Sequence, residues 1–102
     1  MHFEIQSRLT EIAALCRRHG VARLDLFGSA SDGQFSIETS DVDLVVEFLP
    51  EARRCAFDNY FGLQEGLEQL LGRPIDLVTD ASIRNPYLRR AIDESRQPLY
   101  GA

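Results

Sequence analysis

The sequence predicts an α/β protein in which a small mixed β-sheet is flanked by helices. Segments with apolar residues at helical spacing alternate along the chain with short segments rich in Val, Leu and Ile, the pattern of a mixed helix and strand fold. The length of 102 residues suits one small domain, spanning residues 1–102, that buries a modest core. No repeat, low-complexity stretch or linker interrupts the sequence.

The helices are predicted from apolar spacing and from residues that begin or end a helix. Apolar residues recur at helical spacing from about Phe3 to His19, and Gly20 supplies a stop. A second apolar series covers residues 57–71 before Gly72. Asn85, as N-cap to Pro86, begins a last helix through residues 87–92.

Short apolar segments predict strands at about residues 23–27, 42–48 and 75–78, and residues 97–100 are a candidate for a further short extended segment. Side chains alternate across a strand, so the second strand divides into two faces. Its core face is expected to hold Val42, Leu44, Val46 and Phe48, and its other face Asp41, Asp43, Val45 and Glu47.

Three aspartates suggest a metal site. Asp41 and Asp43 project from one side of a strand, where they repel each other unless a cation or a proton separates them, and magnesium prefers such oxygen ligands. Asp76 interrupts an apolar strand, where burial without a partner would be costly and a metal could be that partner. If the two strands are neighbours, two carboxylates could bridge a pair of cations. The third could bind one cation or accept a proton from an attacking hydroxyl, as nucleotidyl transfer requires.

Gly28 and Ser29 are expected to form a turn between a strand and a short helix. Such a turn lets backbone N–H groups and a hydroxyl approach an anion, which suits a phosphate-binding role. Ser40, directly before Asp41, is read either as a turn residue or as support for this nucleotide-binding site.

Composition excludes several other functions. With 16 acidic and 11 basic residues the net charge is -5, which disfavours a broad nucleic-acid interface. All 11 basic residues are Arg, so neither a P-loop lysine nor a Schiff-base lysine is present. Cys16 and Cys55 lack zinc-binding spacing. No secretion signal or apolar run of roughly 18 residues is recognised, so a cytoplasmic protein without membrane contact is expected.

The runs at residues 26–33 and 40–48 resemble the minimal nucleotidyltransferase family of the DNA polymerase β-like superfamily. That family has the pattern Gly-Ser-x-x-x-Gly, a spacer and Ser-Asp-x-Asp-Leu, and residues 73–78 and 85–88 also look like it. The resemblance covers nearly the whole chain and implies a polymerase β-like nucleotidyltransferase fold. It further implies that Gly28 and Ser29 hold the triphosphate of ATP, while Asp41, Asp43 and Asp76 bind two Mg²⁺ ions.

Many members of this family are antitoxins that silence a small helical HEPN ribonuclease by adding AMP to a tyrosine. The resemblance therefore implies a hetero-oligomer with a HEPN toxin. One departure is Ser31-Asp32-Gly33 where the family usually has Ala-Arg-Gly, which places a negative charge where a phosphate-neutralising arginine is typical. The alternative function is a weakened or inactive antitoxin that neutralises its toxin by binding alone. Transfer to a small molecule is disfavoured because little chain remains to form an acceptor pocket.

Other side chains are expected to have structural or docking roles. The pairs Arg17-Arg18 and Arg89-Arg90 are predicted to lie on solvated helix faces. The aromatic residues of segment 57–61 suit a core or an interface better than adenine stacking. A partner could dock on Tyr87, Leu88, Leu99 and Tyr100 if these residues form an exposed patch.

Overall fold

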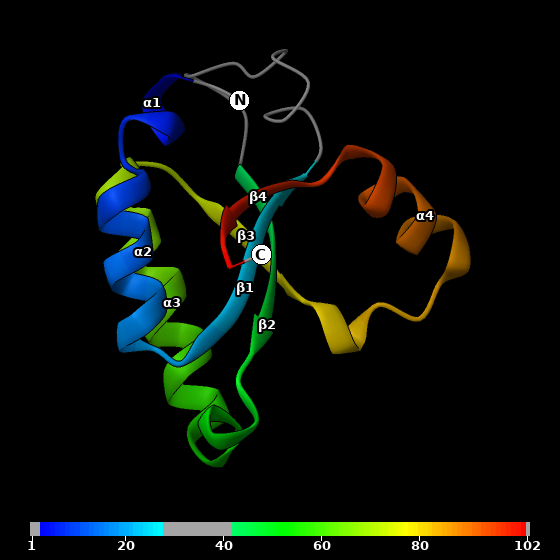
Figure 1. Cartoon of the computed structure of the whole chain (residues 1–102), viewed down its shortest axis with the longest axis horizontal. Helices are drawn as coiled ribbons and strands as arrows, with labels where there is room; N and C mark the ends of the chain where they lie inside the picture. Colours follow the sequence, from blue (N-terminus) through cyan, green and yellow to red (C-terminus); the bar gives the residue numbers. More distant parts are fainter. Residues whose placement is uncertain (1–2, 28–41, 102) are drawn as a thin grey trace.

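The computed structural model describes residues 3–27 and 42–101. In this part of the chain the fold is a four-stranded mixed sheet with the strand order β3-β2-β1-β4 (Figure 1). β2 runs parallel to β3 and antiparallel to β1, and β1 is antiparallel to β4. The strands are β1 (Val21–Phe27), β2 (Val42–Phe48), β3 (Ile75–Thr79) and β4 (Gln97–Tyr100). The predicted mixed sheet and its strands are confirmed.

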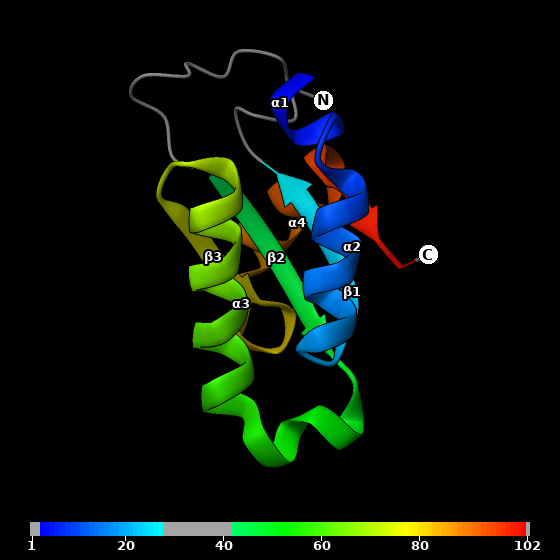
Figure 2. The ribbon, with the colours of Figure 1, turned by 90° about the vertical axis from the view of Figure 1, so that its left-hand side faces the viewer.

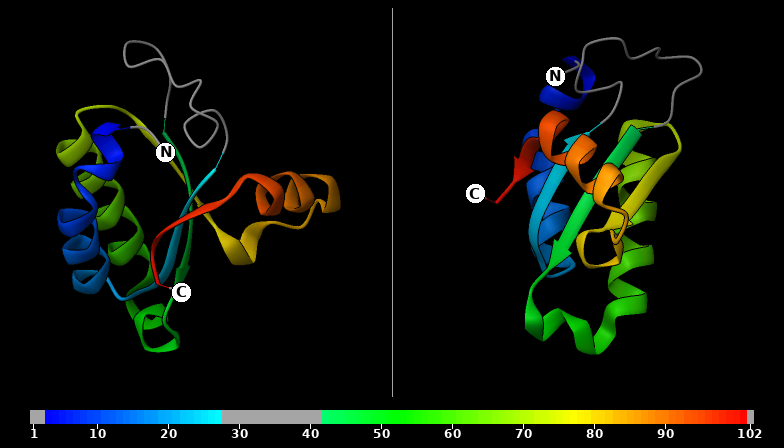
Figure 3. Two further views of the ribbon diagram at one scale, coloured as in Figure 1. Left: turned by 45° about the horizontal axis from the view of Figure 1, so that its top comes forward. Right: turned by 90° about the vertical axis from the view of Figure 1, so that its right-hand side faces the viewer.

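Helices cover both faces of this sheet. They are α1 (Phe3–Gln6), α2 (Leu9–Arg18), α3 (Ala56–Leu71) and α4 (Pro86–Ser95), with 3-10 helices η2 (Pro50–Cys55) and η3 (Asp80–Ser82). Figure 2 shows α2 and α3 side by side on one face, and Figure 3 shows α4 (orange) on the opposite face. None of the helices in residues 3–27 and 42–101 is long and apolar enough to cross a membrane.

The predicted helix ends are confirmed where local chemistry determines them. α3 ends at Gly72, whose φ of 68° is a left-handed conformation that glycine adopts without steric cost. At the start of α4, the Asn85 Oδ1 atom accepts hydrogen bonds from the backbone N–H groups of Tyr87 (2.9 Å) and Leu88 (3.3 Å).

The prediction of a single helix over about residues 3–19 is wrong, because the chain forms two helices, α1 and α2, separated by a turn at Ser7 and Arg8. The Arg8 N–H donates to the Ile5 carbonyl at 3.0 Å, a tight three-residue turn in place of a four-residue helical bond. Ile5 and Ile12 are both buried, so the apolar spacing that predicted one helix reflects burial on both sides of the turn.

Two apolar cores lie on the two faces of the sheet. The larger core, under α2 and α3, is formed by Ile5, Ile12, Cys16, Val21, Leu24, Leu26, Val42, Leu44, Val46, Leu63, Leu67, Ile75, Leu77 and Leu99. The smaller core, under α4, contains Val45, Ile83 and Ile92, with Phe27 and Val78 packed against it. Val45 lies on the same face of β2 as Asp43, as predicted. The smaller core covers this part of the face, so Val45 is only 1% exposed.

Side chains of α3 hold this helix along β3. The Tyr60 hydroxyl donates to the Leu77 carbonyl, and Gln64 Nε2 donates to the Ile75 carbonyl at 3.1 Å. The Ile75 N–H donates to Glu68 Oε2 at 3.1 Å. Because residues four apart lie on one side of a helix, Tyr60, Gln64 and Glu68 form a polar row that follows the strand.

Candidate functional site

Asp43 and Asp76 lie side by side on neighbouring strands. β2 and β3 are parallel, and Asp43 is the register partner of Asp76. Neighbouring strands lie about 4.8 Å apart, so both carboxylates project from the same face at close range. The predicted neighbourhood of the two strands is confirmed. The other predicted site residues, Gly28, Ser29, Ser40 and Asp41, lie outside the described residues.

Asp43 and Asp76 lie near the starts of β2 and β3, at the end of the sheet where β1 ends. Asp43 is the second residue of β2, Asp76 is the second residue of β3, and Asp43 also pairs with Phe27 at the end of β1. Segment 28–41 joins Phe27 to Val42, so the proposed phosphate-binding turn and Asp41 are joined covalently to this end of the sheet.

Asp76 is exposed, so its carboxylate does not carry the cost of burial that the apolar strand around it suggested. Its neighbours Ile75 and Leu77 turn into the main core, and the alternation of strand side chains leaves the carboxylate in solvent. Burial, and secondarily the negative charge of Asp76, raise the pKa of Tyr60, which keeps that hydroxyl protonated for its bond to Leu77.

Two neighbouring carboxylates, Asp43 and Asp76, are ligands of the kind that a divalent cation prefers. Magnesium uses one or two protein carboxylates and completes its shell with water and phosphate oxygens. Within residues 3–27 and 42–101, no group of three or more Asp, Glu, His or Cys side chains is placed to hold a metal. If the three predicted acids bind metal, Asp43 and Asp76 would be two of the ligands and Asp41 would be the third.

An ion-pair network, which sequence reasoning missed, lies on the same face of the sheet. At its centre is Asp25 of β1, which is 0% exposed. Its Oδ2 atom accepts from Arg96 Nε at 2.9 Å and Arg96 Nη2 at 2.5 Å, and lies 2.7 Å from Arg23 Nε. The Asp25 Oδ1 atom has no hydrogen-bond partner among the residues that the structure describes.

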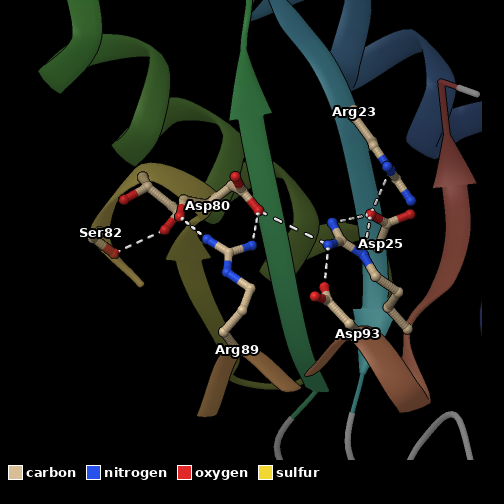
Figure 4. A network of polar contacts seen from close by, with 8 residues as sticks. Arg23, Asp25, Asp80, Ser82, Arg89 and Asp93 are labelled. Carbon is tan, nitrogen blue, oxygen red and sulfur yellow. Dashed lines mark hydrogen bonds and ion pairs between the residues drawn. The ribbon is translucent and has the colours of Figure 1, made fainter. Parts of the chain in front are cut away.

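The network continues from Arg96 to the helices on this face (Figure 4). Arg96 Nη1 lies 2.9 Å from Asp93 of α4 and 3.9 Å from Asp80 of η3. Arg89 Nη1 donates to Asp80 Oδ1 at 2.8 Å, and Arg89 Nη2 donates to the Asp80 carbonyl at 2.9 Å. The prediction of a solvated Arg89 is therefore wrong, whereas Arg90 is exposed as predicted.

The charges within this network balance. Three arginines, Arg23, Arg89 and Arg96, face three aspartates, Asp25, Asp80 and Asp93. Burial opposes ionisation of Arg96, but hydrogen bonds to Asp25 and Asp93 and the nearby negative charges raise its pKa above the usual value. The six charged groups of the network therefore carry no net charge.

The residues expected to dock a partner divide into two groups. Tyr87 and Leu88 are 84% and 46% exposed at the start of α4, as the docking hypothesis requires. Leu99 is buried, and Tyr100 packs against the larger core, so these two residues are not part of an exposed patch.

A groove of about 780 Å³ lies between α2 and α3 and is lined by residues such as Leu15, His19, Gly62 and Gly66. These helices cover the face of the sheet away from α4 (Figure 2). Asp43 and Asp76 do not line this groove, so it is separate from the candidate site.

Residues 11–99 match the family model of the nucleotidyltransferase domain. Curated relatives agree with that match. A protein of Methanocaldococcus jannaschii, provisionally named a protein adenylyltransferase, is 39% identical over 94 residues, covering 84% of this chain and 92% of the relative. The protein adenylyltransferase MntA of Thermococcus cleftensis is 35% identical over 94 residues, covering 89% of each chain.

Solved structures share the fold. A provisionally named minimal nucleotidyltransferase superposes with a TM-score of 0.76 at 32% identity, covering 91% of this chain and 90% of that one. A chain in the crystal structure of a toxin–antitoxin with AMP-PNP superposes with a TM-score of 0.68 at 25% identity, covering 92% of this chain and 73% of that one.

Proposed function

Because this chain belongs to the nucleotidyltransferase domain family, we propose that it is a magnesium-dependent protein adenylyltransferase that acts as an antitoxin. Its substrate would be ATP, and its acceptor would be a tyrosine hydroxyl of a cognate HEPN ribonuclease toxin. The observation that carries the proposal is the register pairing of Asp43 with Asp76 on adjacent parallel strands. That pairing brings two acids together on neighbouring strands, which supports a shared divalent cation.

Each candidate site residue has a proposed role. Asp41, Asp43 and Asp76 would hold two Mg²⁺ ions, which would neutralise charge on the triphosphate and the leaving pyrophosphate. Gly28, Ser29 and Ser40 would hold the triphosphate through N–H and hydroxyl groups. In the transfer, the acceptor oxygen bonds to the α-phosphorus, the bond to the β-phosphate bridging oxygen breaks, and pyrophosphate leaves. Asp76, which is exposed, accepts the hydroxyl proton.

A protein acceptor is supported by the size of the chain and by its relatives. Residues 3–27 and 42–101 form the sheet, its covering helices and two cores, which supports presentation of the acceptor by another molecule. Similarity to protein adenylyltransferases and to a chain of a toxin–antitoxin structure supports a protein partner. The exposed Tyr87 and Leu88 offer that partner an apolar contact.

The second candidate function is neutralisation by binding alone. It is favoured by Asp32, which stands where the family usually has an arginine and adds negative charge to a segment proposed to bind phosphate. The fold and the docking contacts would then serve the same partner without transfer of AMP.

The experiment measures nucleotide binding and AMP transfer in parallel. Millimolar AMP-PNP with Mg²⁺ is expected to raise the melting temperature of the wild-type protein, because a ligand that binds only the native state stabilises it. Asp43→Asn should abolish the Mg²⁺-dependent shift. Mass spectrometry of a candidate HEPN partner, after incubation with this protein, ATP and Mg²⁺, should show added AMP that is absent with Asp76→Asn.

Asp58→Asn is the matched control, because Asp58 is an exposed acid in the first turn of α3 and is not part of the site. It should keep both the thermal shift and the transfer. Transfer that persists in Asp43→Asn would contradict the proposed metal site. A HEPN protein that is inhibited but unmodified would favour neutralisation by binding alone.

A further inference from the structure

Asp25 is a buried carboxylate that the proposed reaction does not use. It comes from the middle of β1, and the hydrogen bonds from Arg96 join it to a residue 71 positions later in the sequence. Arg96 directly follows α4 and precedes β4, so this contact fixes the point at which the chain returns from α4 to the sheet.

The side of α4 that faces the sheet carries Arg89 and Ile92, and Arg96 directly follows the last residue of the helix. Ile92 is the one fully buried residue of α4, and the two arginines bind Asp80 and Asp25 on either side of it. Because α4 contributes only one fully buried residue, the ion pairs are a large part of its contact with the sheet. Buried ion pairs add little net stability, but they can select one arrangement over others.

This contact region borders the candidate site. Ile92 belongs to the smaller core, against which Phe27 and Val78 pack. Phe27 is the register partner of Asp43, and Val78 follows Asp76 by two residues on the same face of β3. A change in the position of α4 on the sheet would therefore shift Phe27 and Val78, which are neighbours of Asp43 and Asp76.

We propose that Asp25 is a positioning residue of the nucleotide site: by holding Arg96, it fixes α4 against the face that carries Asp43 and Asp76 and so maintains affinity for a nucleoside triphosphate. This inference rests on the proposed function, since it concerns nucleotide binding at the same acids. Asp25 acts through Arg96 and α4, so it is distinct from the metal ligands.

The test removes the ion pair without leaving a buried charge. Asp25→Leu alone would leave Arg96, whose side chain is 15% exposed, without its bonds to Asp25 and could prevent folding, whereas Asp25→Leu with Arg96→Met replaces the pair by apolar groups, an exchange that is often neutral for stability. The Arg23 side chain is 36% exposed and can keep its charge in water. The double variant should melt near the wild-type temperature but bind AMP-PNP with Mg²⁺ about tenfold more weakly by calorimetry. Amides of residues 86–95 should exchange hydrogen faster even without nucleotide.

Two further variants test whether the loss of affinity is specific to the contact between Asp25 and Arg96. Arg96→Lys keeps the charge but cannot reproduce the two contacts from Nε and Nη2, so it should fold and show a smaller loss of affinity. Arg90→Gln with Glu94→Gln is the matched control, because this exposed ion pair lies on the same helix and should leave affinity and exchange unchanged.

Wild-type affinity in the double variant would overturn the proposal, whether or not exchange in α4 becomes faster. Unchanged exchange in α4 would also overturn it, because Asp25 would then not hold the helix. If the wild-type protein itself fails to bind AMP-PNP with Mg²⁺, that result contradicts the proposed function. The proposed effect of Asp25 on nucleotide affinity is then contradicted as well.

Discussion

The Tyr60 hydroxyl is a single group on which the packing of α3 against β3 depends. It donates to the Leu77 carbonyl, one residue from Asp76. Tyr60→Phe should lower the free energy of unfolding by about 1 kcal/mol, because the partly buried carbonyl loses its donor while the ring stays in place. Urea denaturation monitored by circular dichroism measures the change.

Tyr87→Phe is the control for this substitution, since Tyr87 is 84% exposed and its hydroxyl can bond to water in any state. It should leave the urea midpoint unchanged. Equal midpoints for Tyr60→Phe and the wild-type protein would show that the contact with Leu77 contributes nothing to stability.

Residues also differ in how far the sequence reveals their roles. The pairing of Asp43 with Asp76 was predictable, because each acid interrupts an apolar strand and the two strands needed only to be neighbours. The pair Asp25 and Arg96 was not predictable, because its members lie 71 positions apart and each looks like an ordinary surface charge in its own segment. Only the folded sheet and α4 bring them together.

At the scale of secondary-structure elements, Gly20 determines how α2 connects to β1. Its φ is 69°, and a Cβ atom there would lie 2.5 Å from the Ala52 Cβ of η2. Its carbonyl also accepts from the Leu49 N–H at 2.9 Å. Gly20→Ala should therefore destabilise the protein by about 2–4 kcal/mol, the sum of left-handed backbone strain and steric overlap. Thermal and urea denaturation measure the loss.

Gly72→Ala separates the two causes, because Gly72 has nearly the same φ, 68°, and open space around its Cβ position. It should cost about 1 kcal/mol, which is the strain alone. If Gly20→Ala and Gly72→Ala lose the same free energy of unfolding, the structure around Ala52 accommodates the added Cβ atom without an energetic cost.

Element boundaries were predictable where a side chain or a special backbone angle sets them. Asn85 and Pro86 begin α4, and Gly72 ends α3, through interactions within a few residues. The turn at Ser7 and Arg8 was not predictable, since no Gly or Pro marks it and apolar burial continues across it.

At the scale of the whole molecule, the two cores differ in size, and this predicts unequal local stability. α2 and α3 cover the larger core, whereas α4 contributes one fully buried residue, Ile92, to the smaller one. Native-state hydrogen exchange should show α4 opening at a lower free energy than β1 and β2, because fewer apolar contacts are lost when it detaches.

Exchange measured over a series of low denaturant concentrations distinguishes local from global opening. Amides of α4 should exchange with little dependence on denaturant, while those of β1 follow the global unfolding curve. Merging of both groups onto one curve would show that the smaller core unfolds only with the larger one.

The polar row of Tyr60, Gln64 and Glu68 also has a consequence for aggregation. β3 is an outermost strand of the sheet, and such strands usually present unpaired backbone groups that can recruit a strand from another chain. Here the row occupies both backbone polar groups of Ile75 and the carbonyl of Leu77. These bonds leave fewer free backbone groups on β3, which disfavours edge-to-edge polymerisation on this side of the described sheet.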